Sequence, residues 1–395
     1  MSTTTLILGG GFGGLSAANR LRHLVPDEHK IVVIDESPDF YVGAGKTWLM
    51  LGERTLAEIS RPRRELLHDG VELVQARVQD IDVDRDTVRT DQGEFAWDHL
   101  VIALGAKLNL DAVPGLKEAS ETFYTVAGAR RLNAVLESFA GGRIAIVIPS
   151  VPFKCPPAPY EAALLLRDQL ERGRLTGKAE IAIHTAEGAP MATAGPQMGE
   201  FVRRQLSERG IAYHPGRKLA QVDGPAQRLT FEEGTDAAYD LLIAVPPHGV
   251  PDPVRVTQLT IHSGWVPVDY LTLKVTSAPS GKDIYAVGDV TAVPLPGRFK
   301  PETPLALPKA GVFADAHGQV VAHQIAATIL GHEPTETFDG RGYCFLEVGG
   351  GKAVKAEGAF FELPHPVMAK HDPSEDQLKD KLAWVARHLG REDRG

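Results

Sequence analysis

The sequence predicts an α/β protein with two Rossmann-like dinucleotide-binding domains and a small C-terminal region. A strand, a glycine-rich turn, a helix and a second strand follow one another at the N-terminus, and another strand-turn-helix unit begins near residue 141. Short apolar strands that alternate with helices are typical of parallel sheets covered by helices. The length of 395 residues allows two or three domains, each with its own core.

The composition excludes several classes of protein. An apolar fraction of 43% with 24% charged residues is that of an ordinary soluble globular chain. The net charge of −9 argues against a nucleic-acid partner, since neutralising phosphates requires a basic face. No apolar run is long enough to span a membrane and no signal peptide precedes the first motif, so we expect a cytoplasmic protein. Two cysteines are too few for a disulfide scaffold or a four-thiolate metal site.

The first nucleotide-binding unit begins at the N-terminus. Residues 4–8 form an apolar run expected to be a strand, residues 15–24 have the pattern of a helix, and residues 30–34 form a second expected strand. Between the first strand and the helix lies a G-x-G-x-x-G turn, whose glycines let a pyrophosphate approach the backbone at the helix N-terminus. These glycines are Gly9, Gly11 and Gly14.

An acidic residue ends the second strand of this unit. Asp35 lies about 20 residues past the last glycine, where an acid bonds a ribose hydroxyl. Glu36 is the alternative if the strand ends one residue later. Residues 40–61 then form either an apolar, aromatic loop over the cofactor or ordinary core, and both interpretations stay open.

Two later segments return to the same unit. Residues 100–106 read as a buried strand that ends in Gly105, and residues 283–290 as a short buried strand that ends in Asp289. Ligands in this class of fold bind at the carboxyl ends of the strands. A long helix is expected to open at residues 307–311, which include Lys309, and to run to about residue 330.

The second unit has a cysteine where a nicotinamide site needs glycines. Residues 143–148 predict a buried strand and residues 161–170 a helix, but the turn between them is rich in proline and contains Cys155. Side chains and fixed proline angles leave little room for a dinucleotide. We expect the nearby helix N-terminus and Lys154 to lower the pKa of the Cys155 thiol. The alternative is an inert, buried cysteine.

These segments divide the chain into four parts. Residues 1–110 form the first part of one nucleotide-binding domain, and residues 265–335 complete it. Residues 111–264 form the second Rossmann-like domain, which carries Cys155. Residues 336–395 form the C-terminal region, which carries Cys344.

Several of these motifs resemble a known family. The segments GGGFGG, IYAVGDV and PKAGVFADAHGQVVA resemble the flavoprotein reductases with two dinucleotide-binding domains, which share the glutathione-reductase-like fold. Within that group, FKCPPAPYE, AVPPHGVPDPV, GWVPVDYLTL and GYCFLEVGGGKA resemble the sulfide:quinone oxidoreductases and the flavocytochrome c sulfide dehydrogenases. The resemblance covers nearly the whole chain, and its most specific part is the placement of both cysteines.

The resemblance implies a cofactor and a set of site residues. FAD would be bound without a covalent link, because both cysteines would serve as a redox pair above the flavin and close enough to share sulfur. Glu161 is a candidate proton acceptor, or else a first-turn carboxylate favoured by the helix dipole. Lys309 would lie near the flavin ring and Asp289 on the ribityl chain. The residues implied at the nucleotide end are Gly9, Gly11, Gly14, Asp35, Val78 and Gly105.

The resemblance also implies a reaction, in which sulfide is oxidised to polysulfide or sulfur and electrons pass to a quinone. Three alternatives stay open. A sulfide dehydrogenase would pass electrons to a cytochrome or another protein, a type II NADH:quinone reductase would take electrons from NADH, and a flavin redox sensor would turn nothing over. The sequence does not indicate an oligomeric state.

The C-terminal tail predicts an amphipathic helix. A capping-box pattern at residues 374–377 precedes Leu378, Leu382, Val385 and Leu389 at helical spacing. Cations flank this stripe: Lys379, Lys381, Arg387 and His388. We hypothesise a peripheral anchor on the inner face of the membrane. The alternative is a helix packed on the protein's own core.

Overall fold

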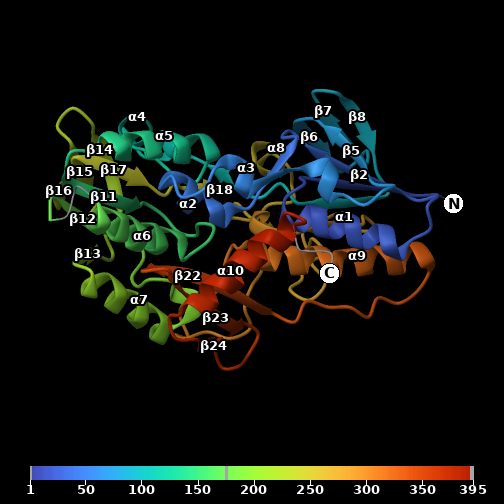
Figure 1. Cartoon of the computed structure of the whole chain (residues 1–395). Coiled ribbons are helices and arrows are strands. Elements are labelled where there is room, and N and C mark those ends of the chain that lie inside the picture. Colours follow the sequence, from blue (N-terminus) through green and yellow to red (C-terminus); the bar gives the residue numbers. More distant parts are fainter. Residues whose placement is uncertain (1, 174–176, 392–395) are drawn as a thin grey trace.

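A computed structural model describes residues 2–173 and 177–391. Figure 1 shows two lobes side by side, with most of the blue N-terminal elements in one lobe and most of the green elements in the other. The red C-terminal strands and helix lie across the junction of the two lobes (Figure 1). This is the predicted α/β fold with two Rossmann-like units.

The first lobe is built on a five-stranded parallel sheet in the order β20-β9-β1-β2-β5. Its strands are β1 (Thr4–Leu8), β2 (Lys30–Asp35), β5 (Glu72–Gln75), β9 (His99–Ile102) and β20 (Ile284–Ala286). Because β20 pairs with β9, a segment that follows the second lobe in the sequence completes the sheet of the first.

Helices α1 (Phe12–Leu24) and α9 (Gly311–Leu330) lie side by side against this sheet (Figure 1). The two helices pack closely because a glycine lies at their contact. A Cβ atom added to Gly318 would lie 2.4 Å from the carbonyl oxygen of Gly13 and 2.8 Å from the amide nitrogen of Ala17. Helix α9 is the helix predicted from residues 307–311 onward. Its close approach to α1 fixes the position of the glycine turn that precedes α1.

The segment expected at residues 40–61 is core rather than a simple loop. It contains β3 (Asp39–Tyr41), η1 (Gly43–Gly45), α2 (Lys46–Met50), α3 (Leu56–Ile59) and β4 (Ser60–Pro62). Trp48 and Met50 on α2 are buried. An antiparallel meander follows, formed by β6 (Val78–Asp82), β7 (Thr87–Thr90) and β8 (Gly93–Ala96).

The second lobe holds a four-stranded parallel sheet in the order β13-β12-β11-β17. Its strands are β11 (Gly142–Ile148), β12 (Ala179–Thr185), β13 (Ile211–His214) and β17 (Leu241–Ala244), and its helices are α5 (Val126–Ser138), α6 (Ala158–Arg172) and α7 (Pro196–Glu208). A second meander consists of β14 (Leu219–Asp223), β15 (Arg228–Phe231) and β16 (Asp236–Ala238).

Short elements connect these parts. They are η2 (Arg63–Leu66), β10 (Lys107–Leu108), η3 (Leu110–Ala112), α4 (Leu116–Ala119), η4 (Ala192–Ala194), β18 (His248–Gly249), α8 (Asp252–Arg255), β19 (Val266–Pro267), η5 (Gly288–Val290) and β21 (Thr291–Ala292). Asp289 therefore lies in a single helical turn after β20, not at the end of the strand as predicted. The turn begins because Gly288 has a φ of +71°, which redirects the chain.

The C-terminal region is an antiparallel sheet with a helix packed on it. The sheet contains β22 (Arg341–Gly349), β23 (Lys352–Ala359) and β24 (Val367–Lys370), and the helix is α10 (Glu375–His388). Ser374 caps α10 by accepting a hydrogen bond from the Gln377 amide, as the capping pattern predicted. Among the described residues, no helix is long and apolar enough to cross a membrane.

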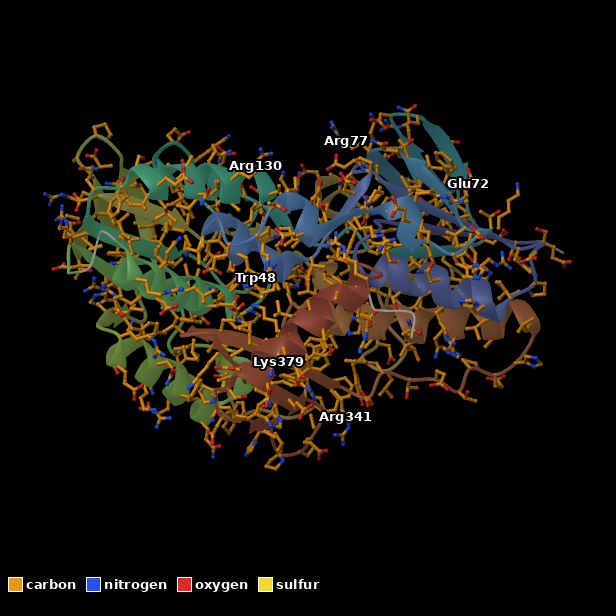
Figure 2. The ribbon with its side chains drawn as sticks, in the orientation of Figure 1. Trp48, Glu72, Arg77, Arg130, Arg341 and Lys379 are labelled. Atoms are coloured by element: carbon orange, nitrogen blue, oxygen red, sulfur yellow. The ribbon has the colours of Figure 1, made fainter. Side chains whose placement is uncertain are left out.

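The apolar stripe of α10 faces the protein. Val385 and Leu389 are buried, and Leu378 and Leu382 are partly buried. Lys379 lies on the outer side with 72% of its side chain exposed (Figure 2), but Lys381, which the sequence placed among the cations beside the stripe, is 2% exposed. The structure thus favours the helix packed on the protein's own core over the membrane anchor.

The glycine contact between α1 and α9 gives a first testable prediction. Gly318→Ala should lower the melting temperature, because the new methyl group would force the two backbones apart at a cost of about 1–3 kcal/mol. Alanine's better helix propensity offsets about 1 kcal/mol of this. Thr328→Ala on the exposed end of the same helix is the control and should change stability by less than about 0.5 kcal/mol. Equal melting temperatures for the two variants would contradict the packing argument.

Candidate active site

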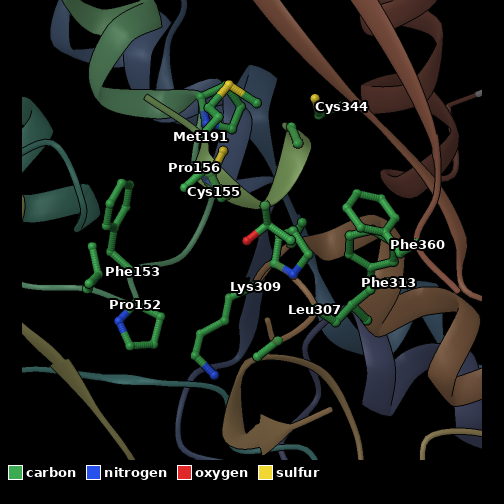
Figure 3. Close-up of a pocket in the computed structure, with 18 of the residues that line it drawn as sticks. Pro152, Phe153, Cys155, Pro156, Met191, Leu307, Lys309, Phe313, Cys344 and Phe360 are labelled. Atoms are coloured by element: carbon green, nitrogen blue, oxygen red, sulfur yellow. The ribbon is translucent and has the colours of Figure 1, made fainter. Parts of the chain in front are cut away.

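A cavity of about 730 Å³ lies where the two lobes and the C-terminal sheet meet. Most of its lining is apolar, with contributions from the turn before α6, the segment before α9, and strands β22 and β24. Cys155 and Cys344 both line it (Figure 3). Residues 189 positions apart in sequence are thus brought to one site, one from the second lobe and one from the C-terminal sheet.

The backbone at Cys155 is held by one contact from the first lobe and, at the preceding residue, by one from the second. Its amide donates a hydrogen bond of 2.7 Å to the carbonyl oxygen of Lys309, which lies just before α9. The carbonyl oxygen of Lys154 accepts a bond of 3.2 Å from the Tyr124 hydroxyl. The backbone of Cys155 adopts a left-handed conformation, with a φ of +56°. That conformation is uncommon for a residue with a Cβ atom, so the position of this thiol is imposed by its surroundings.

Burial raises the pKa of both thiols. The pKa of Cys155 rises to about 11, first because of burial and then because of the Glu161 carboxylate, while Lys381 and Lys46 oppose the shift. The pKa of Cys344 rises to about 12, again through burial first and then through Cys155 and Glu161. The prediction of a lowered pKa at Cys155 is therefore wrong, because desolvation outweighs the nearby cations.

Two lysines bring positive charge to this region. Burial, and then Lys154, lowers the pKa of Lys46 to about 7. Burial lowers the pKa of Lys309 to about 8, which leaves it mostly protonated at neutral pH. The Lys309 ammonium donates to the carbonyl oxygens of Asp289 at 2.7 Å and Thr291 at 3.0 Å, and lies 3.5 Å from the ring centre of Trp265. It lines the cavity with most of its hydrogen-bonding capacity already used.

The glycine turn fits a bound pyrophosphate. A Cβ atom added to Gly14 would lie 1.9 Å from the carbonyl oxygen of Gly9, so these two positions close the turn on itself. A Cβ atom on Gly11 would meet no atom within 4 Å, so this side of the turn is open. Helix α1 has no acidic residue in its first turn and no side-chain cap, which leaves its N-terminal amides available to an anion.

The acid at the end of β2 is tied to this turn. One oxygen of Asp35 accepts a hydrogen bond of 2.7 Å from the Gly10 amide, and the other lies 3.2 Å from the Arg63 guanidinium. Arg63 also donates to the Gly10 carbonyl oxygen at 2.7 Å. Glu36, the alternative, is 64% exposed and pairs with Arg77. Asp35 is the acid that the structure places at the glycine turn.

The other residues expected at the nucleotide end are spread around the first sheet. Val78 begins β6 and is 8% exposed. Gly105 follows β9 with a φ of +68°, and a Cβ atom there would meet no atom within 4 Å. Both flank the first sheet near its carboxyl edge, where this class of fold binds its nucleotide.

Glu161 is not a solvent-exposed helix-end carboxylate. It is 4% exposed, and one of its oxygens accepts hydrogen bonds from the Lys381 ammonium at 2.9 Å and the Thr47 hydroxyl at 3.1 Å. Its other oxygen accepts a hydrogen bond of 3.0 Å from the backbone amide of Glu347. Sequence reasoning missed Glu347 and misplaced Lys381. The available signal was that Lys381 falls inside the apolar stripe of α10, between Leu378 and Val385.

At the corresponding edge of the second lobe, a buried tyrosine and an acid are joined by a hydrogen bond. Tyr160, at the start of α6, is fully buried, and its hydroxyl donates to the carboxylate of Glu187, which follows β12. Thr185 also donates to Glu187, at 3.3 Å. Burial raises the pKa of Glu187 to about 7, although these hydrogen bonds oppose the shift. The turn after β11 has prolines and Cys155 in place of the glycines that admit a pyrophosphate, and this turn and Glu187 line the cavity.

Comparisons with known proteins agree with this geometry. Residues 3–148 match the family model of the pyridine nucleotide-disulphide oxidoreductases. Residues 127–246 match the model of the central part of the flavoprotein chain of sulfide dehydrogenase (flavocytochrome c). The mouse mitochondrial sulfide:quinone oxidoreductase is 26% identical over 377 residues, which cover 91% of this chain and 78% of that protein.

Two further relatives extend the comparison. The crystal structure of the sulfide:quinone oxidoreductase of Aquifex aeolicus has a TM-score of 0.86 at 23% identity and covers 99% of this chain and 92% of that one. A demethylphylloquinone reductase of Synechocystis is 38% identical over 249 residues, or 58% of each chain.

The fold and the matched segments define a flavoprotein oxidoreductase with two dinucleotide-binding domains, which binds FAD. The two family models and the relatives that match most of the chain indicate which flavoproteins of this class the chain resembles. The chain is similar to the sulfide:quinone oxidoreductases along most of its length, and residues 127–246 match the flavoprotein chain of flavocytochrome c sulfide dehydrogenase.

The cysteine positions give a prediction about the cofactor. FAD should be held without a covalent bond, because both thiols line the cavity and the family resemblance implies that they form a redox pair. Acid precipitation of the purified protein should release all of the yellow colour into the supernatant. Flavin that stays on the pellet and travels with a peptide containing Cys155 or Cys344 in mass spectrometry would overturn this assignment.

Proposed function

We propose that this protein oxidises sulfide through Cys155 and Cys344, with FAD as the electron carrier and a quinone as the acceptor. One observation carries the proposal. The two cysteines of the chain line a single apolar cavity between the FAD-binding lobe, the second lobe and the C-terminal sheet. The named relatives act on sulfide and a quinone, and the same chemistry fits a cavity that contains two thiols.

Both cysteines are free thiols in the structure, and the proposed cycle would start from their two-electron oxidised form, a disulfide. Hydrosulfide attacks one sulfur, so that one S–S bond forms as a persulfide and the original S–S bond breaks, with the other cysteine leaving as a thiolate. The two electrons lost by the sulfide sulfur are then held by the leaving thiolate. Bound FAD would supply the two-electron acceptor that takes them when the thiolate and the persulfide join through the new sulfur, with loss of the persulfide proton. Glu161 lines the cavity beside both thiols and handles the proton.

The apolar end of the cavity suits a quinone. Phe345, Phe360 and Met368 line it, and the nearby side chains of Leu363 and Val367 are 71% and 53% exposed. Contact of this edge with a membrane surface would deliver a lipid-soluble acceptor directly to the cavity. In this proposal the peripheral contact is made by the β23–β24 turn, since the stripe of α10 faces the protein core.

The alternatives are separated by electron donor and acceptor. The match to the flavocytochrome c sulfide dehydrogenase model supports a protein acceptor as the second candidate, and it predicts sulfide oxidation without a quinone response. The prolines and Cys155 in the turn after β11, where a nicotinamide site needs glycines, argue against a type II NADH:quinone reductase. A redox sensor would show no steady-state consumption of sulfide.

The paired-cysteine mechanism is tested by substitution. Cys155→Ser and Cys344→Ser should each slow sulfide-driven reduction of the flavin on the order of a thousandfold or more, because each removes one of the two reacting sulfurs. FAD content and melting temperature should stay close to wild type. Ser150→Ala in the same turn as Cys155 is the control and should keep the wild-type rate. A single cysteine variant that reduces its flavin at nearly the wild-type rate would rule out this mechanism.

The turn after β11 predicts inertness toward nicotinamide cofactors. NADH and NADPH should not bleach the flavin under anaerobic conditions on the time scale of the sulfide reaction, because this turn carries prolines and Cys155 where a nicotinamide site has the glycines that admit the pyrophosphate. Stopped-flow absorbance of the flavin measures both reactions. Rapid bleaching by NADH would replace the sulfide proposal with the NADH reductase.

A further inference from the structure

We infer that Glu347 is a positioning residue that keeps an exchangeable proton on Glu161, beside the two cysteines. The inference rests on the proposed function for its role in turnover. Its structural basis is a buried cluster of two carboxylates and one ammonium that links the elements carrying the cysteines.

The cluster is centred on the ammonium of Lys381, which α10 supplies. It donates to Glu161 at 2.9 Å and to Glu347 at 2.6 Å. Glu161 is on α6, which follows Cys155, and Glu347 is on β22, the strand that contains Cys344. The Glu347 amide donates to Glu161 at 3.0 Å, so the strand and the helix also contact each other directly.

Glu347 has a second donor that fixes its carboxylate. The indole nitrogen of Trp48 donates at 2.7 Å to the same oxygen that accepts from Lys381. The Lys381 ammonium also lies 4.8 Å from the Trp48 ring centre. Glu161 and Lys381 line the cavity, whereas Glu347 is not among its lining residues. The arrangement places Glu161 toward the reacting sulfurs and Glu347 behind it.

The buried cluster contains two acidic side chains but only one basic side chain. Lys381, Glu161 and Glu347 are 2%, 4% and 5% exposed. Two ionised carboxylates with one ammonium would leave a net negative charge there, which low-dielectric surroundings disfavour. Protonating one carboxylate restores neutrality.

The surrounding groups decide which carboxylate takes the proton. Burial lowers the pKa of Lys381, but the two carboxylates together raise it above its ordinary value, so the ammonium persists. Burial raises the pKa of Glu161, Lys381 opposes the shift, and Glu347 adds to it. The other groups that face the cluster are Thr47 and Trp48 from α2, Cys155, Cys344, and Glu53, which is 39% exposed. Glu161 is the acid of the pair that lines the cavity, so we assign to it the proton that exchanges with the sulfurs.

A proton at this place completes the sulfur chemistry. When hydrosulfide opens the disulfide, the sulfur that leaves belongs to a thiol whose pKa lies at about 11 or 12, so it takes a proton readily. Glu161 donates that proton and becomes a carboxylate beside Lys381. The persulfide then gives its proton back to Glu161. No proton has to come from water inside the apolar cavity.

The experiment removes the charge of Glu347 and measures the pH at which Glu161 loses its proton. In Glu347→Gln, Glu161 loses the neighbour that raises its pKa, so its carboxyl group should deprotonate at lower pH. Infrared difference spectroscopy of the oxidised holoenzyme during a pH titration measures this through the C=O band of the protonated acid, which Glu161→Gln should abolish. We expect the midpoint to fall by about one pH unit or more, a tenfold change in the equilibrium.

The pH profile of sulfide-driven flavin reduction gives the second readout. Its alkaline limb should move to lower pH in Glu347→Gln, because the protonated Glu161 that donates to the leaving sulfur disappears sooner. Glu347→Asp keeps the charge and should restore the wild-type midpoint. Glu53→Gln, a more exposed carboxylate near Glu347 that does not touch Lys381, is the matched control and should shift neither readout.

The outcomes separate this inference from the proposed function. If the infrared midpoint is the same in wild type, Glu347→Gln and Glu347→Asp, the inference is wrong whatever the sulfide activity. If sulfide fails to reduce the wild-type flavin while the infrared midpoint still shifts, the proposed function is wrong and the role of Glu347 toward Glu161 stands. If Glu347→Gln does not fold, Glu347→Asp and Glu161→Gln still show whether the C=O band belongs to Glu161. If wild type shows no such band, the inference is wrong.

Discussion

The buried ammonium of Lys381 is the interaction on which the arrangement of the site depends. It joins α10 to α6 and β22 through two acidic side chains, and all three groups are almost fully removed from solvent. Removing the ammonium would leave the buried acids without their cation, at a cost of about 3–5 kcal/mol. The C-terminal helix is therefore part of the core of the site, and the relative position of the two cysteine-bearing elements depends on a residue far from both in sequence.

A second constraint comes from glycine. The contact of Gly318 with the backbone of α1 sets the position of the turn that contains Gly9, Gly11 and Gly14. The Cys155 amide bonds to the carbonyl oxygen of Lys309, just before α9. The same helix pair thus determines where the FAD site lies and, through one hydrogen bond, where the reactive turn of the second lobe lies against it.

The parts of the molecule that follow from local pattern could be predicted from the sequence. The first strand, the glycine turn and Asp35 lie where spacing alone placed them, because strand, turn and helix here are determined within a few tens of residues. The length of α9 and the cap at Ser374 are local in the same way.

The electrostatics could not be predicted, because they depend on contacts across the whole chain. Lys154 lies next to Cys155 in sequence and suggested a lowered pKa, but burial by the first lobe and the C-terminal sheet raises it. Lys381 looked like a surface cation on an amphipathic helix, yet its partners come from α6 and β22. Desolvation depends on the assembled fold, so it cannot be predicted from the residues that are neighbours in the sequence.

The left-handed backbone of Cys155 has a consequence for how such a site is retained. A non-glycine residue in that region carries a strain of about 1–3 kcal/mol, which glycine would not. Selection for stability alone would therefore replace this cysteine with glycine and gain a firmer fold. The thiol persists at a position where stability and chemistry have opposite preferences, so a stabilised variant found by screening melting temperature should be checked at this residue first.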